Sequence, residues 1–140
     1  MLIKVTHNPI DRDEALRAVA DPSCGAVTSF EGNIRNHNEG KEVLGLEYEV
    51  YEGFLKAEVE RIFREAGEQW PVAKVALIQR VGRLDVGETG IIIAVSSPHR
   101  KAALSACSYI IEEFKKRAPV WKKEHYPDGS DWVYCAHHSQ

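Results

Sequence analysis

The hydrophobic residues of this chain recur with two different periods, and each period predicts a different kind of element. Over residues 44–50, apolar side chains alternate with Glu47 and Glu49, which predicts a half-buried strand with antiparallel neighbours. Over residues 53–70, apolar side chains recur at spacings of three and four, which predicts an amphipathic helix ending before Pro71. We expect this helix to cover a sheet.

Four more segments are predicted to be strands. Two of them are residues 1–6 and residues 25–34. The other two, residues 74–81 and 90–96, are rich in β-branched and aliphatic side chains. Because only the turn-forming segment 83–88 separates this last pair, we expect the two strands to lie side by side.

Two further helices are predicted from the residues at their ends. Asp11, with Glu14 three residues later, fits a capping box that opens a helix running to about residue 20. Ser97 and Pro98 supply a cap and a first-turn proline for a second helix, which carries an apolar stripe and stops before Pro119.

The remaining segments are polar. Residues 36–41 lack apolar periodicity and contain Asn and Gly, which predicts a flexible loop. The tail after Pro127 is short and polar, with Trp132 and Val133 as its expected anchors. Since no internal repeat or linker interrupts the chain, the order of elements predicts one α+β domain over residues 1–140, a mostly antiparallel sheet covered by helices.

Composition agrees with a folded protein: 44% of the residues are hydrophobic and 28% are charged. No stretch approaches the roughly 18 to 20 apolar residues of a membrane span, and the first residues lack the long apolar core of a signal peptide. We therefore expect a cytoplasmic protein that does not bind a membrane. Cys24, Cys107 and Cys135 are widely spaced and odd in number, which favours reduced, structural thiols.

Charge is distributed unevenly. The formal net charge is −3, which argues against a surface built for nucleic acid. Residues 98–123, however, contain seven Lys or Arg and two Glu, a local excess of five positive charges. This segment indicates either a site for an anion or a solvated basic face.

His99 and Arg100 follow Ser97-Pro98 directly. Positive charge in the first turn of a helix is disfavoured by roughly 0.3 to 1 kcal/mol, so this placement needs a reason. One reason is function, because free backbone N–H groups with an adjacent arginine and histidine suit a phosphate. The alternative is a solvated pair whose cost is offset elsewhere.

Other cations have both structural and functional interpretations. Lys115 lies in the last turn of the predicted helix, where the helix dipole alone explains a lysine. Lys122 lies beyond the helix and beside Trp121, and partial desolvation there would make it usable as a proton shuttle or nucleophile. Arg35 ends a predicted strand, from which a guanidinium can clamp a phosphate or carboxylate.

Metal binding is not expected. His37, His125, His137 and His138, even with Cys135, have none of the spacings that zinc ligands use. The common hydrolase and nucleotide-binding signatures are also missing.

Several segments, taken together and in order, resemble the large subunit of molybdopterin synthase, the MoaE family. The match is collinear from about residue 25 to residue 133. It rests on Gly25-Ala26-Val27, on Gly32-Asn33-Ile34-Arg35-Asn36-His37-Asn38, on Arg80-Val81-Gly82, on Ser97-Pro98-His99-Arg100, and on the run from Lys115 through Arg117-Ala118-Pro119-Val120-Trp121 to Glu124.

The resemblance implies a hammerhead-type fold and a homodimer within a heterotetramer, each copy binding a small ubiquitin-like sulfur-carrier subunit, the MoaD-like partner. It implies that the carrier's C-terminal Gly-Gly thiocarboxylate gives sulfur to cyclic pyranopterin monophosphate, which becomes molybdopterin, with no cofactor. Carried over residue by residue, it marks two catalytic lysines and seven substrate-binding residues. These are Lys115 and Lys122, and Asn33, Ile34, Arg35, His99, Arg100, Lys123 and Glu124.

One position departs from the family pattern. Ala136 stands where related chains place an arginine that reaches the neighbouring subunit's pocket, so His137 or His138 would have to substitute, or that contact is absent.

Our hypothesis is that Arg35, His99 and Arg100 hold the phosphate and pterin, while Lys115 and Lys122 orient the thiocarboxylate and handle protons. It requires all five residues to converge in one cavity. Two alternatives remain open at this point. One is a noncatalytic anion-binding module for a nucleotide or RNA, and the other is a structural partner subunit that uses the basic helix end only for docking.

Overall fold

The computed structural model describes residues 1–134, which form three helices, two four-stranded sheets and a short two-stranded hairpin. The first sheet has the order β1-β6-β8-β2. Only the β1–β6 pair is parallel. The bounds of its strands are β1 Leu2–Thr6, β6 Lys74–Arg80, β8 Thr89–Ser97 and β2 Ala26–Asn33.

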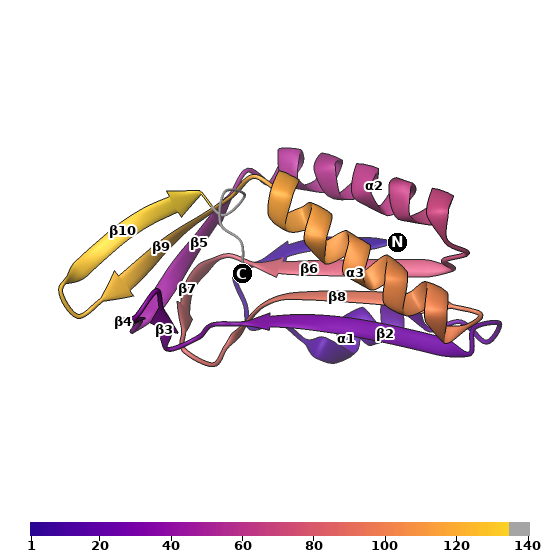
Figure 1. Ribbon diagram of the computed structural model, residues 1–140, viewed down its shortest axis with the longest axis horizontal. Helices are drawn as coiled ribbons and strands as arrows, with labels where there is room; N and C mark the ends of the chain where they lie inside the picture. Colours follow the sequence, from indigo (N-terminus) through magenta and orange to yellow (C-terminus); the bar gives the residue numbers. More distant parts are fainter. Residues whose placement is uncertain (135–140) are drawn as a thin grey trace.

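The second sheet has the order β10-β9-β5-β7 and is antiparallel throughout. Figure 1 shows it projecting from one end of the molecule, away from the first sheet. The small hairpin of β3 and β4 lies beside it. The bounds of these strands are β10 Gly129–Tyr134, β9 Val120–Tyr126, β5 Gly45–Val50, β7 Gly82–Asp85, β3 His37–Asn38 and β4 Lys41–Glu42.

Helices cover both faces of the first sheet. Helices α2 (Glu52–Gln69) and α3 (Arg100–Arg117) pack on one face, and α1 (Arg12–Val19) packs on the other (Figure 1). This arrangement confirms the predicted α+β class with mostly antiparallel strands. No helix in the described part of the chain is long and apolar enough to span a membrane.

The central strands of the first sheet are buried on both sides, which explains their nearly continuous apolar sequence. Leu77 and Ile93 face α2 and α3, where they join a core that includes Leu55 and Ile110. The alternate residues of the same strands join a second core beneath α1 that includes Ala15, Val19, Ala76, Ile78 and Ile92. Burying each large aliphatic side chain contributes about 1.5 to 3 kcal/mol, so the first core holds α2 and α3 on one face of the sheet and the second core holds α1 on the other.

Most regular elements fall where the pattern predicted them. The alternating segment is β5, and both of its neighbours are antiparallel. The helix expected over residues 53–70 is α2, and the two strands expected to pair are β6 and β8.

Two helix-end predictions were wrong in detail. Ser97 does not cap α3, because its hydroxyl donates to the Pro71 carbonyl, and the N-cap is His99 instead. Asp11 does cap α1, but the Glu14 carboxylate accepts from Lys4 on β1 rather than closing a capping box.

Three segments predicted as loops contain strands. β7 overlaps the turn-forming segment, β3 and β4 overlap the polar loop, and β10 lies in the short tail. β9, between the last helix and that tail, was not predicted either. β7, β9 and β10 acquire their structure by pairing with β5 or with each other, so their own sequence carries little of the signal.

Candidate functional site

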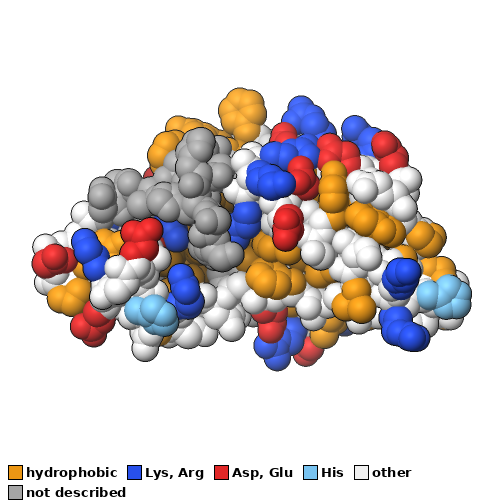
Figure 2. Space-filling view, viewed as in Figure 1, with side chains coloured by type: hydrophobic (Ala, Val, Ile, Leu, Met, Phe, Trp, Pro, Cys, Tyr) orange, Lys and Arg blue, Asp and Glu red, His pale blue; other side chains and the backbone are white. Residues whose placement is uncertain are grey.

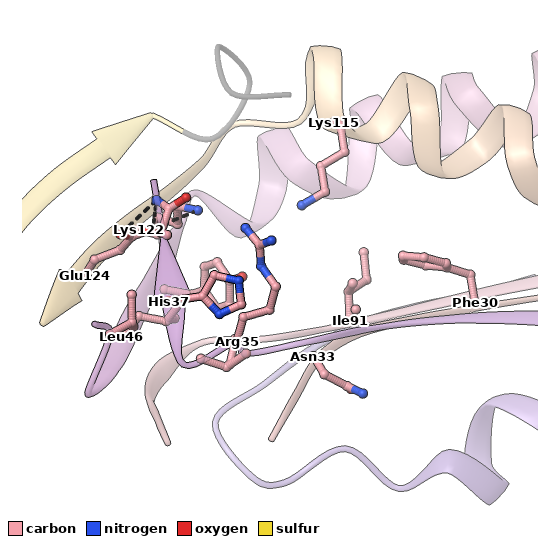
Figure 3. A pocket seen from close by; sticks show the side chains of 14 residues that line it. Phe30, Asn33, Arg35, His37, Leu46, Ile91, Lys115, Lys122 and Glu124 are labelled. Carbon is pink, nitrogen blue, oxygen red and sulfur yellow. Dashed lines mark hydrogen bonds and ion pairs between the residues drawn. The ribbon is translucent and has the colours of Figure 1, made fainter. Parts of the chain in front are cut away.

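A pocket lies where the last turn of α3 meets the junction between the two sheets (Figure 3). About 560 Å³ of space lies within it, counting the part open to solvent. The lining residues are Phe30, Gly32, Asn33, Ile34, Arg35, His37, Asn38, Val43, Leu46, Tyr48, Ile91, Lys115, Lys122 and Glu124. We call this the site pocket.

Three cationic side chains reach the site pocket from three separate segments. Arg35 follows the end of β2, Lys115 comes from the last turn of α3, and Lys122 lies on β9. Figure 3 shows the Arg35 guanidinium and the Lys115 ammonium pointing into the same space. Glu124 is the one carboxylate among the lining residues, so the pocket has an excess of positive charge.

Lys122 and Glu124 form a buried ion pair at one side of the site pocket (Figure 3). Lys122 Nζ lies 3.1 Å from Glu124 Oε1, and the two side chains are 9% and 3% exposed. Asn38 Nδ2 donates to both Glu124 oxygens at 3.0 and 3.1 Å, and the Tyr126 hydroxyl donates to Oε2. Breaking a buried ion pair by removing one partner is strongly destabilising, so this cluster holds its members in fixed positions.

The electrostatics of Glu124 follow from these contacts. Burial is the largest single influence and raises the pKa of Glu124, but the hydrogen bonds from Tyr126, Asn38 and Lys122 together lower this pKa below its ordinary value. Glu124 is therefore ionised at neutral pH.

Two of the residues carried over by resemblance line the site pocket without offering it charge. Ile34 is buried and packs with Leu46 and Leu84. Asn33 directs its side chain elsewhere, since its Oδ1 accepts from the Thr89 hydroxyl at 2.8 Å. Asn33 ends β2 and Ile34 follows it, so both directly precede Arg35 in the chain.

His99 and Arg100 do not join the site pocket, so the expected convergence of five cations in one chain was wrong. Both are exposed at the start of α3, and Figure 2 shows Lys or Arg and His side chains at that end of the molecule, on the right. Arg100 precedes Lys115 by fifteen residues on one helix, which separates their backbones by roughly 22 Å.

The positive excess over residues 98–123 is also not a single patch. Lys123 lies on the face of β9 opposite Lys122, because alternate residues of a strand point to opposite sides. Arg117 turns to α2, where it donates to Glu65 at 2.6 and 3.0 Å and to Glu58 at 2.6 Å. Much of the local charge is thus neutralised or directed away from the site pocket.

Several lining residues were not predicted. His37 and Asn38 were placed in a flexible loop, yet the short hairpin brings both to the site pocket. His37 had been considered as a metal ligand and as part of the motif that carries the resemblance, but not as a site residue. Tyr48 was expected on the buried face of its strand, and nothing in its spacing shows that this face opens into a cavity. The side chain of Phe30 closes the opposite end (Figure 3).

Cys135, Ala136, His137 and His138 lie outside the described residues. The two alternatives for this position, substitution by His137 or His138 or absence of the contact, therefore both stand. Trp132 and Val133 lie on β10.

Comparison with known proteins identifies the family of this chain. Residues 5–117 match the family model described as MoaE protein. The human molybdopterin synthase catalytic subunit is 44% identical over 131 residues, which covers 94% of this chain and 70% of the relative.

Solved structures give the same result. The crystal structure of molybdopterin synthase from Staphylococcus aureus superposes with a TM-score of 0.88 at 36% identity, covering 92% of this chain and 94% of that one. A complex of subunits 1 and 2 of the molybdopterin-converting factor from Helicobacter pylori contains a chain with a TM-score of 0.77 at 25% identity, covering 99% of this chain and 92% of that one. With a family model that spans most of its length, this chain belongs to the MoaE family.

Proposed function

We propose that this chain is the catalytic subunit of a molybdopterin synthase. In this reaction, sulfur passes from the C-terminal thiocarboxylate of a small ubiquitin-like carrier to cyclic pyranopterin monophosphate, and two transfers give the dithiolene of molybdopterin. The proposal is supported by family membership and by relatives that bear this name. The comparisons favour it over a noncatalytic module that binds a nucleotide or RNA.

The single observation that carries the proposal is the meeting of Arg35, Lys115 and Lys122 in one pocket. The substrate phosphate and the thiocarboxylate are both anionic and repel each other. Cations held in place by the fold offset this repulsion and stabilise charge that develops in the transition state. An arginine suits the phosphate because its planar guanidinium donates two parallel hydrogen bonds.

We assign roles from these positions. Arg35 binds the phosphate and pterin of the precursor. Lys115 and Lys122 orient the thiocarboxylate and transfer protons while sulfur attacks the precursor and the ring opens. Asn33 and Ile34 keep Arg35 in place.

The carrier subunit is the partner that this function requires. The Helicobacter pylori structure is described as a complex of two subunits, and we propose an equivalent complex here. The carrier's body would rest on the surface, and its glycine tail would enter the site pocket beside Lys115 and Lys122.

A second copy of the chain gives His99 and Arg100 a role. Because they lie roughly 22 Å from Lys115 along α3, they can serve this pocket only if they come from a neighbouring subunit. We propose a homodimer in which these residues of the second copy complete the phosphate site. The cytoplasmic location expected from the sequence stays a prediction.

Lys115→Ala tests the proposed function. The complex with thiocarboxylated carrier is mixed with the cyclic precursor, and dithiolene product is measured. We expect wild type to form product and Lys115→Ala to be slower by roughly a hundredfold or more, the usual scale of acid–base and electrostatic contributions. The melting temperature should not change.

Lys116→Ala is the matched control. It removes the same charge from the next residue of the same helix turn, where Lys116 pairs with Glu113 at 3.3 Å outside the site pocket. Its turnover should equal that of wild type. Absence of product with wild type would overturn the proposed function, and near-normal turnover of Lys115→Ala would remove Lys115 from the mechanism.

A further inference from the structure

The Glu124 carboxylate is fully occupied by groups of the protein itself. Its two oxygens accept from Lys122, from Asn38 twice and from Tyr126. It is only 2% exposed. A buried negative charge with these donors already in place has little capacity for a substrate hydrogen bond, and it would repel the anionic substrates of the proposed reaction.

Three members of this cluster share one face of one strand. Lys122, Glu124 and Tyr126 alternate along β9, so their side chains point to the same side. Strand pairing fixes their spacing, because Lys122 is paired with Tyr48 and Glu124 with Leu46 on β5. The carboxylate thus lies between an ammonium on one side and a phenol on the other.

The fourth member comes from a distant part of the chain. Asn38 lies on the β3–β4 hairpin, 86 residues before Glu124 in sequence. The same hairpin makes one other contact with β9, because Lys41 Nζ on β4 lies 5.1 Å from the centre of the Tyr126 ring. Just after the hairpin, the Leu44 N–H donates to the His125 carbonyl at 2.8 Å and extends the pairing of β5 with β9.

We propose that Asn38 and Tyr126 are positioning residues for the sulfur-transfer reaction, acting through Glu124 to hold the Lys122 ammonium at the site pocket. Glu124 is then a support for Lys122 and not a ligand of the substrate, which revises the role that resemblance gave it. This inference rests on the proposed function, because it assigns the effect to the step that Lys122 serves.

The geometry explains why a neutral donor pair is needed. With Lys122 alone, the second oxygen of Glu124 would be buried without a partner, which costs about 1 to 3 kcal/mol or more for a charged group. Asn38 and Tyr126 fill the remaining acceptor positions without adding charge. The carboxylate can then neither rotate nor take up a proton at neutral pH, and Lys122 has one fixed counter-ion.

Tyr126→Phe tests the inference with the smallest change. It removes the hydroxyl that donates to Glu124 and keeps the ring that Lys41 contacts. In single-turnover reactions of the complex with thiocarboxylated carrier, we expect sulfur transfer to slow by roughly three- to tenfold, the worth of one hydrogen bond. Asn38→Ala should slow it in the same way.

Binding of the precursor separates positioning from substrate contact. The probe is cyclic pyranopterin monophosphate itself, titrated into the complex with a carrier that ends in an ordinary carboxylate and cannot donate sulfur. We expect its dissociation constant for Tyr126→Phe to stay within about twofold of wild type, because the hydroxyl contacts only protein in this scheme. A dissociation constant ten times larger than that of wild type would make Tyr126 a substrate ligand and overturn the inference.

A double-variant cycle shows whether the effect passes through Lys122. In the Lys122→Arg variant, the longer side chain and planar guanidinium cannot occupy the place of the lysine ammonium. Adding Tyr126→Phe to this variant should change its remaining rate by less than about twofold. If the full factor persists there, Tyr126 does not act through Lys122.

Two controls keep the outcomes distinct. Tyr51→Phe removes a phenol from an exposed residue outside the site pocket, and Asn8→Ala removes an amide from an exposed loop. Both should react at the wild-type rate. If wild type forms no dithiolene, the proposed function fails, whereas normal transfer by both Tyr126→Phe and Asn38→Ala would overturn only the positioning inference.

Discussion

Lys115 and Arg117 lie two residues apart in the last turn of α3, and the fold uses their charges in different ways. Lys115 lines the site pocket. Arg117 lies between α2 and α3, where its guanidinium donates to Glu58, Glu65 and Glu113. Residues two apart on a helix point about 200° apart around its axis, so one faces the pocket and the other faces the neighbouring helix.

A run of like charges is thus divided here between a structural role and a place in the site pocket. The hydrogen bonds from Arg117 to Glu65 and Glu58 raise the pKa of Arg117 and hold the pKa of Glu65 at about 2. We call Arg117 with these three acids and Tyr109 the helix clamp. Because the clamp fixes the end of α3 on α2, it also fixes the direction from which Lys115 enters the pocket.

Breaking the clamp should affect stability far more than chemistry. Arg117→Met keeps most of the side-chain volume and leaves three carboxylates without their shared cation. We expect a loss of about 2 kcal/mol in the free energy of unfolding, given that the side chain is 26% exposed and partly screened. For a chain of this length the melting temperature should fall by roughly 6 °C, measured by circular dichroism.

The turnover of Arg117→Met should differ from that of Lys115→Ala. Well below its melting temperature, Arg117→Met should retain turnover within about threefold of wild type, since Lys115 stays on an intact helix. Lys116→Met, which loses only an exposed pair, should lose at most about 1 kcal/mol. A hundredfold loss of turnover in fully folded Arg117→Met would show that the roles of Lys115 and Arg117 cannot be separated.

The contribution of the helix clamp to the free energy of unfolding should also depend on pH. Glu65 has a lowered pKa in the folded protein, so its contribution is present above the ordinary glutamate pKa near 4.5 and is lost as pH falls through about 2. Glu58 and Glu113 face the same guanidinium. Arg117→Met removes the largest cause of the shift.

The measurement is the melting temperature of wild type and Arg117→Met from pH 7 to pH 2. We expect the difference in melting temperature between the two proteins to stay constant down to about pH 5 and then to become smaller. Glu88 and Glu124 also have lowered pKa values, but they are common to both proteins and cancel in the difference. A gap that widens in acid would contradict this account of Glu65.

Much of the fold could be predicted because its signals are local. The alternation around Glu47 and Glu49 identified β5, and apolar spacing identified α2. β7 and β9 were missed because they pair with β5 from residues far away in sequence. Apolar and polar residues do not alternate clearly at the start of β9, over residues 120–123. Its structure therefore depends on pairing with β5.

The site was predictable in part for the same reason. Arg35, Lys115 and Lys122 stood out by their positions at the ends of elements, but only the fold shows that they meet. The separation of His99 from Lys115 could have been foreseen, because both were placed on one helix and each residue adds about 1.5 Å. Resemblance grouped them as one site, and within one chain the fold keeps them apart.

The smallest effect is expected for the Tyr109 hydroxyl of the helix clamp. The Tyr109 hydroxyl donates to Glu65 Oε1 at 2.6 Å, and its ring meets Trp70 edge-on with centroids 5.6 Å apart. Tyr109→Phe keeps the ring contact and removes one neutral donor, while Arg117 still holds the carboxylate. We expect a loss of about 1 kcal/mol and a melting temperature lower by roughly 3 °C, with turnover unchanged. If Tyr109→Phe destabilised the protein as much as Arg117→Met, the phenol rather than the guanidinium would be the main support of Glu65, and the contrast between Lys115 and Arg117 would lose its physical basis.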